Sequence, residues 1–208
     1  MIKRLLVASW CAFILAGCQS SAINPRMLEH SLDEQFLLAN YRYLASDNLL
    51  GRKVGTKSSE LAQQHLITQL RQINVMPLNG QYKHPFIVNR SVSTTVLGNN
   101  IVGQILAPAS TNYIVLTAHF DHLGKKGNHI FNGADDNASG TAATLALMKK
   151  LTEHRAKLKH NILVVFTDGE ESGLKGSRAF VKQNARLMAK VKLNINLDML
   201  AGSKYSNR

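Results

Sequence analysis

Short apolar runs alternate with amphipathic segments through the second half of the chain. The runs have the length of buried strands, and the segments between them repeat their apolar residues at helical spacing. The expected strands cover residues 113–118, 161–167 and 191–197, and the expected helices cover 139–151 and 174–185. This alternation is typical of an α/β sandwich whose sheet is largely parallel at its centre.

The first part of the chain predicts two helices. Ser31 and Glu34 have the spacing of a capping box, with Ser31 as the N-cap, which predicts a helix from there to about Ala45. A second amphipathic helix is expected over residues 59–73. Its apolar face is formed by residues at helical spacing, namely Leu66, Leu70 and Ile73.

Residues 86–107 change to a strand pattern, in which Val, Ile and Thr alternate with other residues. Gly98-Asn99-Asn100 is rich in turn-forming residues, so a turn is expected within this region. The pattern leads without a break into the regular α/β part, so residues 31–208 are expected to form one domain.

The N-terminus has the pattern of an export signal. Lys3 and Arg4 precede an apolar stretch at residues 5–15, which is shorter than the roughly 20 residues of a membrane-spanning helix. The stretch ends in Leu-Ala-Gly-Cys18, which looks like a bacterial lipobox, although an ordinary cleaved signal or an uncleaved anchor are the alternatives. The sequence therefore predicts a lipoprotein signal peptide at 1–17 and a tether at 18–30. A lipid on Cys18 would anchor the chain to the cell envelope, with the periplasmic side of the outer membrane favoured.

Charge and cysteine content limit the kinds of partner and chemistry that the chain is expected to have. The formal net charge is +12, and it falls to +10 when the signal peptide takes Lys3 and Arg4 with it. The basic residues are scattered and form no arginine-rich run, so no nucleic-acid partner is expected. The two cysteines are Cys11 and Cys18, which leaves the expected mature domain without a disulfide or a cysteine nucleophile.

Each of the three expected core strands runs into residues that bind metals or move protons. A further pair of acids, Asp135 and Asp136, precedes the helix at 139–151. The groups that follow the strands are His119-Phe120-Asp121, Asp168-Gly169-Glu170-Glu171, and Asp198. Carboxyl ends of parallel strands meet at one edge of a sheet. Imidazole and carboxylate together suit divalent cations, whereas this many acids without a cation would repel one another. The sequence therefore predicts a metal site.

These segments resemble the zinc aminopeptidases of the aminopeptidase Y and bacterial leucyl aminopeptidase type. The shared motifs are His-x-Asp at 119–121, Gly-Ala-x-Asp-x-Ala-Ser-Gly at 133–140, Glu-Glu-x-Gly-Leu-x-Gly-Ser at 170–177 and Asn-Leu-Asp-Met at 196–199. Order and spacing also match, and the Gly51-Arg52 loop resembles the N-terminal part of the family. The resemblance implies a three-layer sandwich with a mixed, centrally parallel sheet.

The resemblance also implies a role for each site residue and two zinc ions. Asp136 would bridge the ions, with His119 and Asp198 completing one shell and Glu171 binding the other ion. Glu170 would be the general base, and Asp121 would orient His119 by a hydrogen bond to its far nitrogen. The implied reaction is removal of N-terminal residues from a peptide substrate by an activated water. The ligand types alone would also admit cobalt or manganese.

The chain departs from the family at one ligand. The family has a further His well beyond the Asn-Leu-Asp-Met segment, whereas no His follows His160 and the sequence stops at Arg208. His122 and His129 lie near the site in sequence but match no ligand position of the family. The second zinc site is therefore expected to lack its imidazole and the sheet its last elements. A fragment, a shortened gene product or completion by another chain would each explain this departure.

Two other functions stay open. A different zinc hydrolase or a glutaminyl cyclase on the same fold would keep similar ligands. An inactive, lipid-anchored binding protein would fit the missing His but would have no need for Glu170. The side-chain preference of the substrate and the oligomeric state do not follow from the sequence.

Overall fold

The computed structural model describes residues 32–91 and 93–202. The signal peptide, the tether and Cys18 lie outside these residues, so those assignments stay predictions. Among the helices within the described ranges, none combines the length and the apolar character needed to span a bilayer.

A six-stranded mixed sheet forms the centre of the molecule. Its main path runs β1-β3-β7-β4-β8, and β2 pairs with β3. The strands are β1 (Met76–Pro77), β2 (Lys83–Arg90), β3 (Thr95–Ile105), β4 (Tyr113–His119), β7 (Asn161–Thr167) and β8 (Val191–Asn196). Strands β7, β4 and β8 are parallel, while β3 runs antiparallel to β1, β2 and β7. The predicted mixed sheet with a parallel centre is therefore confirmed.

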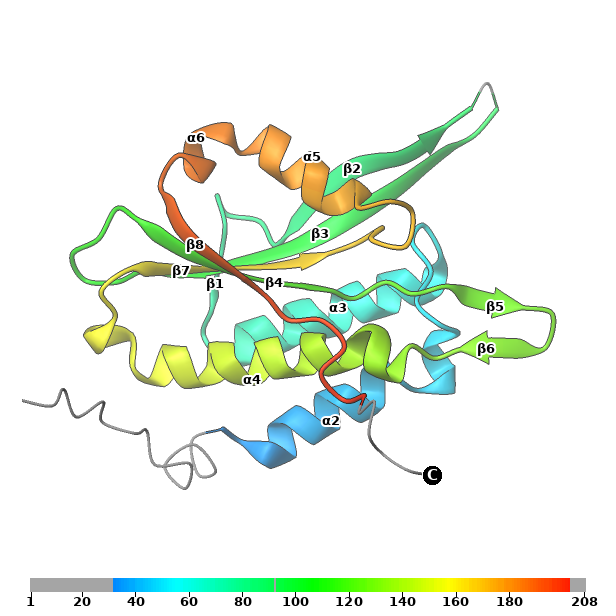
Figure 1. Cartoon of the computed structure of the whole chain (residues 1–208), viewed down its shortest axis with the longest axis horizontal. Helices are drawn as coiled ribbons and strands as arrows, with labels where there is room; N and C mark the ends of the chain where they lie inside the picture. The colour runs from blue at the N-terminus through cyan, green and yellow to red at the C-terminus, as the bar shows by residue number, and fades with distance from the viewer. Residues whose placement is uncertain (1–31, 92, 203–208) are drawn as a thin grey trace, which may run out of the picture.

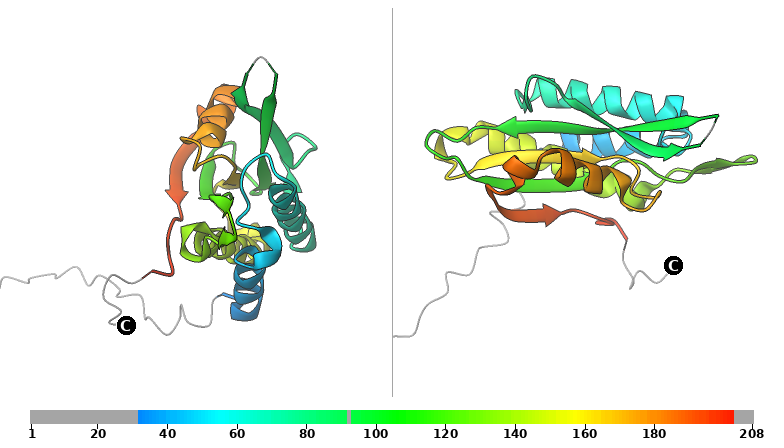
Figure 2. Two further views of the ribbon diagram at one scale, coloured as in Figure 1. Left: turned by 90° about the vertical axis from the view of Figure 1, so that its right-hand side faces the viewer. Right: turned by 90° about the horizontal axis from the view of Figure 1, so that it is seen from above.

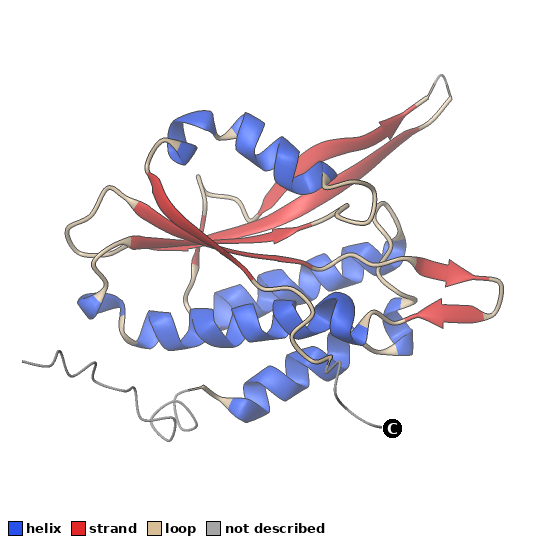
Figure 3. Cartoon of the chain, viewed as in Figure 1, coloured by secondary structure: helices blue, strands red, loops and turns tan. Residues whose placement is uncertain are grey.

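Helices cover both faces of this sheet, as Figures 1 and 2 show. One side carries α2 (Glu34–Leu44), α3 (Lys57–Gln72) and α4 (Gly140–Glu153), and the other carries α5 (Lys175–Gln183) and α6 (Ala185–Met188). Secondary-structure colouring in Figure 3 makes the three layers plain. A short hairpin of β5 (Gly124–Lys126) and β6 (His129–Phe131) projects at the carboxyl edge of the central strands, and no sequence pattern predicts it.

Two apolar cores arise because neighbouring residues of a strand face opposite sides of the sheet. In β7, Val164 and Phe166 pack into the larger core with helices α2, α3 and α4. Leu163 and Val165 pack into the smaller core with Phe180 of α5. Every residue of β7 is buried, which explains the apolar run between its polar end residues, Asn161 and Thr167.

The start of α2 differs from the prediction. The helix begins at Glu34, and its N-cap is Asp33, whose Oδ1 accepts a hydrogen bond from the Phe36 amide at 2.9 Å. Glu34 is thus the first helical residue and cannot take the third position of a capping box that begins at Ser31. The prediction of Ser31 as N-cap was wrong because Asp caps a helix as well as Ser does.

The predicted turn at residues 98–100 was also wrong. These residues lie inside β3, and the β2–β3 hairpin turns where the Ser91 amide donates to the Thr94 carbonyl oxygen at 2.8 Å. Gly98 is needed for packing, since a Cβ there would lie 2.5 Å from the ring of Phe86. Asn100 is buried, and its side chain is satisfied there because it accepts from the Asp168 amide and donates to the Gly176 carbonyl oxygen.

Candidate active site

The residues that follow β4, β7 and β8 meet at the carboxyl edge of the sheet. These three strands are neighbours and run parallel, so their carboxyl ends point the same way. The loop before α4 reaches the same edge, and its Asp136 lies between residues from all three strand ends. The sequence-based prediction that these segments converge is confirmed.

One group of possible metal ligands surrounds His119, the last residue of β4. Its Nε2 lies 2.9 Å from Asp136 Oδ1 and 3.4 Å from Asp198 Oδ1. His119 is 4% exposed, whereas Asp136 and Asp198 are partly open to solvent. Burial lowers the pKa of His119, but Asp121, Asp198 and Asp136 together outweigh this effect and raise it to about 9.

A second group lies beside the first and shares Asp136. His122 Nδ1 lies 2.7 Å from Glu171 Oε1 and 3.9 Å from Asp136 Oδ2. Asp136 therefore turns one carboxylate oxygen to each group. His122 Nδ1 and Glu171 Oε1 are buried and make no hydrogen bond within the described part of the chain.

The loop that carries Asp136 is tied to the segment after β8. The side chain of Asn137 donates to the Leu197 carbonyl oxygen at 3.0 Å and accepts from the Met199 amide at 3.2 Å. Asp135 Oδ1 accepts from the amides of Ala201 and Gly202 at 2.8 and 2.9 Å. These bonds fix Asp136 relative to Asp198.

Asp121 connects two strand ends. It is fully buried, and its carboxylate accepts hydrogen bonds from the amides of Glu170 at 3.0 Å and Glu171 at 3.4 Å. His119 Nδ1 lies 3.2 Å from the Asp121 carbonyl oxygen and 3.7 Å from Oδ1. The hydrogen bond at the far nitrogen of His119 thus goes to the backbone of Asp121, while the Asp121 carboxylate holds the backbone of both glutamates.

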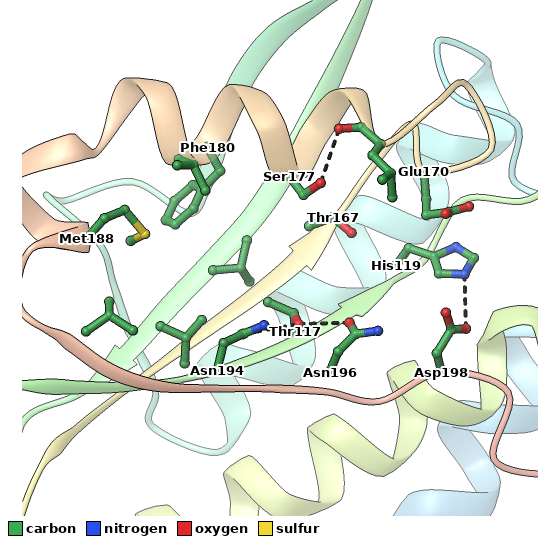
Figure 4. A pocket seen from close by; sticks show the side chains of 15 residues that line it. Thr117, His119, Thr167, Glu170, Ser177, Phe180, Met188, Asn194, Asn196 and Asp198 are labelled. Carbon is green, nitrogen blue, oxygen red and sulfur yellow. Dashed lines mark hydrogen bonds and ion pairs between the residues drawn. The ribbon is translucent and has the colours of Figure 1, made fainter.

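Glu170 lies at one end of a cavity of about 370 Å³. Figure 4 shows Glu170, His119 and Asp198 together at this end, with Phe180 and Met188 toward the other. Burial raises the pKa of Glu170, as do Glu171, Asp121 and Asp198, while His119 opposes the rise. A raised pKa brings a carboxylate closer to the range in which it can accept and return a proton near neutral pH.

Asp168 lies at the same strand end but belongs to neither ligand group. Its side chain accepts from the Asn99 amide at 3.1 Å and the Gly169 amide at 3.0 Å. It is fully buried, and burial raises its pKa to about 7. Asp168 therefore joins β3 to the end of β7 beneath the site.

Arg52 supports the site in a way that its sequence position does not reveal. It is fully buried, and its guanidinium donates to the carbonyl oxygens of Leu44, Phe120 (2.7 Å), Asn132 (2.6 Å) and Gly133 (3.0 Å). Burial lowers the pKa of Arg52 to about 10, while Asp121 and Asp136 oppose that shift. In the sequence, the supporting role of Arg52 is indicated only by its place in the Gly51-Arg52 loop.

The residues present fit a divalent cation. Each group combines one imidazole with two carboxylates, and its ligand atoms all lie within 4.8 Å of one another. Imidazole and carboxylate oxygen are ligands that zinc commonly takes. The two buried atoms without hydrogen bonds in the second group also face this position. The carboxyl edge of this α/β sandwich therefore carries a candidate binding site for divalent metal ions.

Comparisons with known proteins agree. The sequence model of peptidase family M28 matches residues 100–207. A probable leucine aminopeptidase 2 from Aspergillus oryzae is 31% identical over 108 residues, which are 51% of this chain and 20% of that protein. The chain therefore belongs to peptidase family M28.

Solved structures share the fold. A Zn-dependent exopeptidase from Parabacteroides distasonis has a TM-score of 0.66 at 20% identity, covering 83% of this chain and 63% of that one. A glutaminyl cyclase from Porphyromonas gingivalis has a TM-score of 0.68 at 23% identity, covering 84% of this chain and 63% of that one. This chain thus spans less than two thirds of each of these relatives. The predicted membership of a zinc aminopeptidase family and the α/β fold are confirmed.

Proposed function

We propose that the chain is a two-metal exopeptidase that removes N-terminal residues from peptides. The observation that carries this proposal is the position of Asp136, whose two oxygens face two separate ligand groups. His119, Asp136 and Asp198 would hold one ion, and Asp136 and Glu171 would take part in holding the other. Zinc is the metal that the family favours.

The bound metals would polarise the scissile carbonyl and lower the pKa of a water near them. Glu170 accepts the proton of that water as its oxygen bonds to the carbonyl carbon. The same carboxyl group then gives the proton to the leaving amine as the carbon–nitrogen bond breaks. Asp121 holds the Glu170 amide at 3.0 Å and so positions this residue. The adjoining cavity has apolar walls that include Val115, Val165 and Phe180, and it would receive a substrate side chain.

The proposal is tested by measuring metal content together with three reactions. Purified chain is loaded with zinc, analysed for metal, and assayed on a free aminoacyl chromogenic substrate, its N-acetylated form and a peptide with N-terminal Gln. We expect two ions per chain, hydrolysis of the free aminoacyl substrate but not of its N-acetylated form, and no release of ammonia from the Gln peptide. Release of ammonia from the Gln peptide without aminoacyl hydrolysis would instead indicate a glutaminyl cyclase. Metal-free chain without turnover of any substrate would favour the binding-protein alternative.

We expect Asp121→Asn to weaken metal binding by about 10- to 100-fold, the usual effect of changing a residue that orients a ligand. The substitution removes the buried negative charge near His119. The NH2 group of Asn would also face the backbone amide of Glu170 or Glu171, and both groups are hydrogen-bond donors. Competition with a chelating dye measures the change. Glu153→Gln alters an exposed carboxylate at the end of α4 and serves as the control. Equal affinities of the two variants would contradict the role of Asp121.

We also propose that Cys18 carries a lipid that anchors the chain to the bacterial envelope, with the periplasmic side of the outer membrane favoured. The support is the basic pair Lys3-Arg4, the apolar stretch at 5–15 and the Leu-Ala-Gly-Cys18 sequence. Cys18→Ser is expected to move the chain from the membrane fraction to the soluble fraction or to leave its signal uncleaved. Detergent phase partition and the mass of the N-terminal peptide measure this outcome. Cys11→Ser is the control, since it should leave anchoring unchanged.

A further inference from the structure

We infer that His122 is a protein ligand of the second metal ion, beside Glu171 and Asp136. This inference rests on the proposed two-metal function and goes beyond it. The motif resemblance gives His122 no ligand role, because in the family the imidazole of this ion comes from a His beyond the Asn-Leu-Asp-Met segment.

The distances between ligand atoms support this assignment. A tetrahedral zinc site with bonds of about 2.0–2.1 Å separates its ligand atoms by about 3.3 Å. His122 Nδ1 lies 2.7 Å from Glu171 Oε1 and 3.9 Å from Asp136 Oδ2, which brackets that value. The first group has comparable separations of 2.9 and 3.4 Å around His119 Nε2. The two imidazoles therefore take equivalent places on either side of Asp136.

The burial of His122 also supports its assignment as a metal ligand. The residue is only 9% exposed, and a buried polar atom ordinarily has a hydrogen bond. Its Nδ1 has none within the described residues, and neither has Glu171 Oε1, although the two atoms are close. A cation between them would satisfy both atoms at once, in place of the direct ion-pair contact that the two atoms make at 2.7 Å.

The ring is held in place by packing. A Cβ on Gly133 would lie 2.6 Å from Cγ and 2.7 Å from Cδ2 of His122, so the glycine backbone lies directly against the ring. Gly133 is fixed in turn, because its carbonyl oxygen accepts from Arg52 at 3.0 Å. The imidazole is thus oriented without using Nδ1, which leaves that atom available to a metal. Three protein ligands with one open position are sufficient for a catalytic zinc ion.

Cobalt binding tests the inference without relying on activity. The full chain is titrated with Co²⁺, and the number of ions and their affinities are measured by calorimetry and visible absorption. Wild-type chain is expected to bind two ions. His122→Ala should weaken one of them by about 100-fold or more, since changing an outer residue already costs 10- to 100-fold. His119→Ala should weaken the other ion, and His129→Ala, which changes an exposed imidazole on β6, should bind like wild type.

His122→Cys provides a direct signature. Thiolate is also a ligand for cobalt and zinc, so this variant should keep two ions and gain the intense near-ultraviolet charge-transfer band of a cobalt thiolate above the wild-type baseline. Two ions whose affinities are unchanged in His122→Ala, with no new band in His122→Cys, would overturn the inference and leave the proposed function standing. A single ion removed only by His119→Ala would overturn it equally. Wild-type chain that binds no cobalt would overturn the inference and the two-metal function together.

Discussion

Glu170→Gln is expected to lower kcat for aminoacyl hydrolysis by about 100- to 10,000-fold, the usual contribution of a general acid–base residue. Gln keeps the shape of the side chain and cannot accept the proton of the attacking water. Its backbone amide still donates to Asp121, so the segment after β7 should keep its conformation. The expected change is therefore in turnover, with the metal content of the chain preserved.

The neighbouring residue provides the matched control for this prediction. Glu171 is in contact with His122 and belongs to a ligand group, whereas Glu170 belongs to neither group among the described residues. Glu171→Gln should lower the affinity for one ion, and its activity should recover in part at high metal concentration. Glu170→Gln should not recover under any metal concentration. Metal loss in Glu170→Gln, or turnover close to that of wild type, would assign the general base to another group.

The central part of the fold is predictable because each signal is local. Apolar runs of strand length give β4, β7 and β8 nearly to the residue, and parallel strands bring their carboxyl ends to one edge. His119, Glu171 and Asp198 can therefore be placed together on sequence grounds alone. The motif resemblance adds Asp136, whose position in the loop before α4 follows no periodicity.

The residues that sequence reasoning misses act through contacts between distant segments. His122 is oriented by Gly133, and Asn137 binds Leu197 and Met199, which lie about 60 residues further along the chain. Gly98 indicates a turn by its residue type, yet Phe86 packing makes it part of a strand. The type of a residue indicates its local conformational preference. At these positions, the conformation depends instead on contacts with residues that are remote in sequence.

Arg52 is the clearest case of such a residue, because one side chain joins three parts of the site. Its guanidinium bonds to the end of α2 at Leu44, to Phe120 between His119 and Asp121, and to Asn132 and Gly133 ahead of Asp136. The charge is tolerated at zero exposure because four carbonyl oxygens and the nearby acids Asp121 and Asp136 compensate for lost water.

Arg52→Met is therefore expected to lower the free energy of unfolding by about 3–5 kcal/mol, the usual cost of breaking a buried charged network. Met fills much of the volume but donates nothing, so four carbonyl oxygens lose a hydrogen bond, and each one left buried and unsatisfied costs about 1–3 kcal/mol. The Gly133 oxygen keeps one donor, the Ala138 amide at 3.0 Å. Arg52→Lys should recover only part of this loss, since an ammonium cannot reproduce the planar fork of the guanidinium. Urea denaturation of metal-free chain measures the change.

Arg71→Met is the matched control, because Arg71 is exposed on α3 and its guanidinium lies 5.5 Å from the ring of Tyr82. That contact is worth about 0.5–1 kcal/mol, so the control should unfold close to wild type. If Arg52→Met were no less stable than Arg71→Met, water entering the site would have to supply the four hydrogen bonds that the guanidinium donates. Arg52 would then not be what sets the loop before α4 against the end of β4. With the expected loss, the Arg52 guanidinium is one of the contacts that hold the segment of Asp136, the ligand that both groups share, against the end of β4.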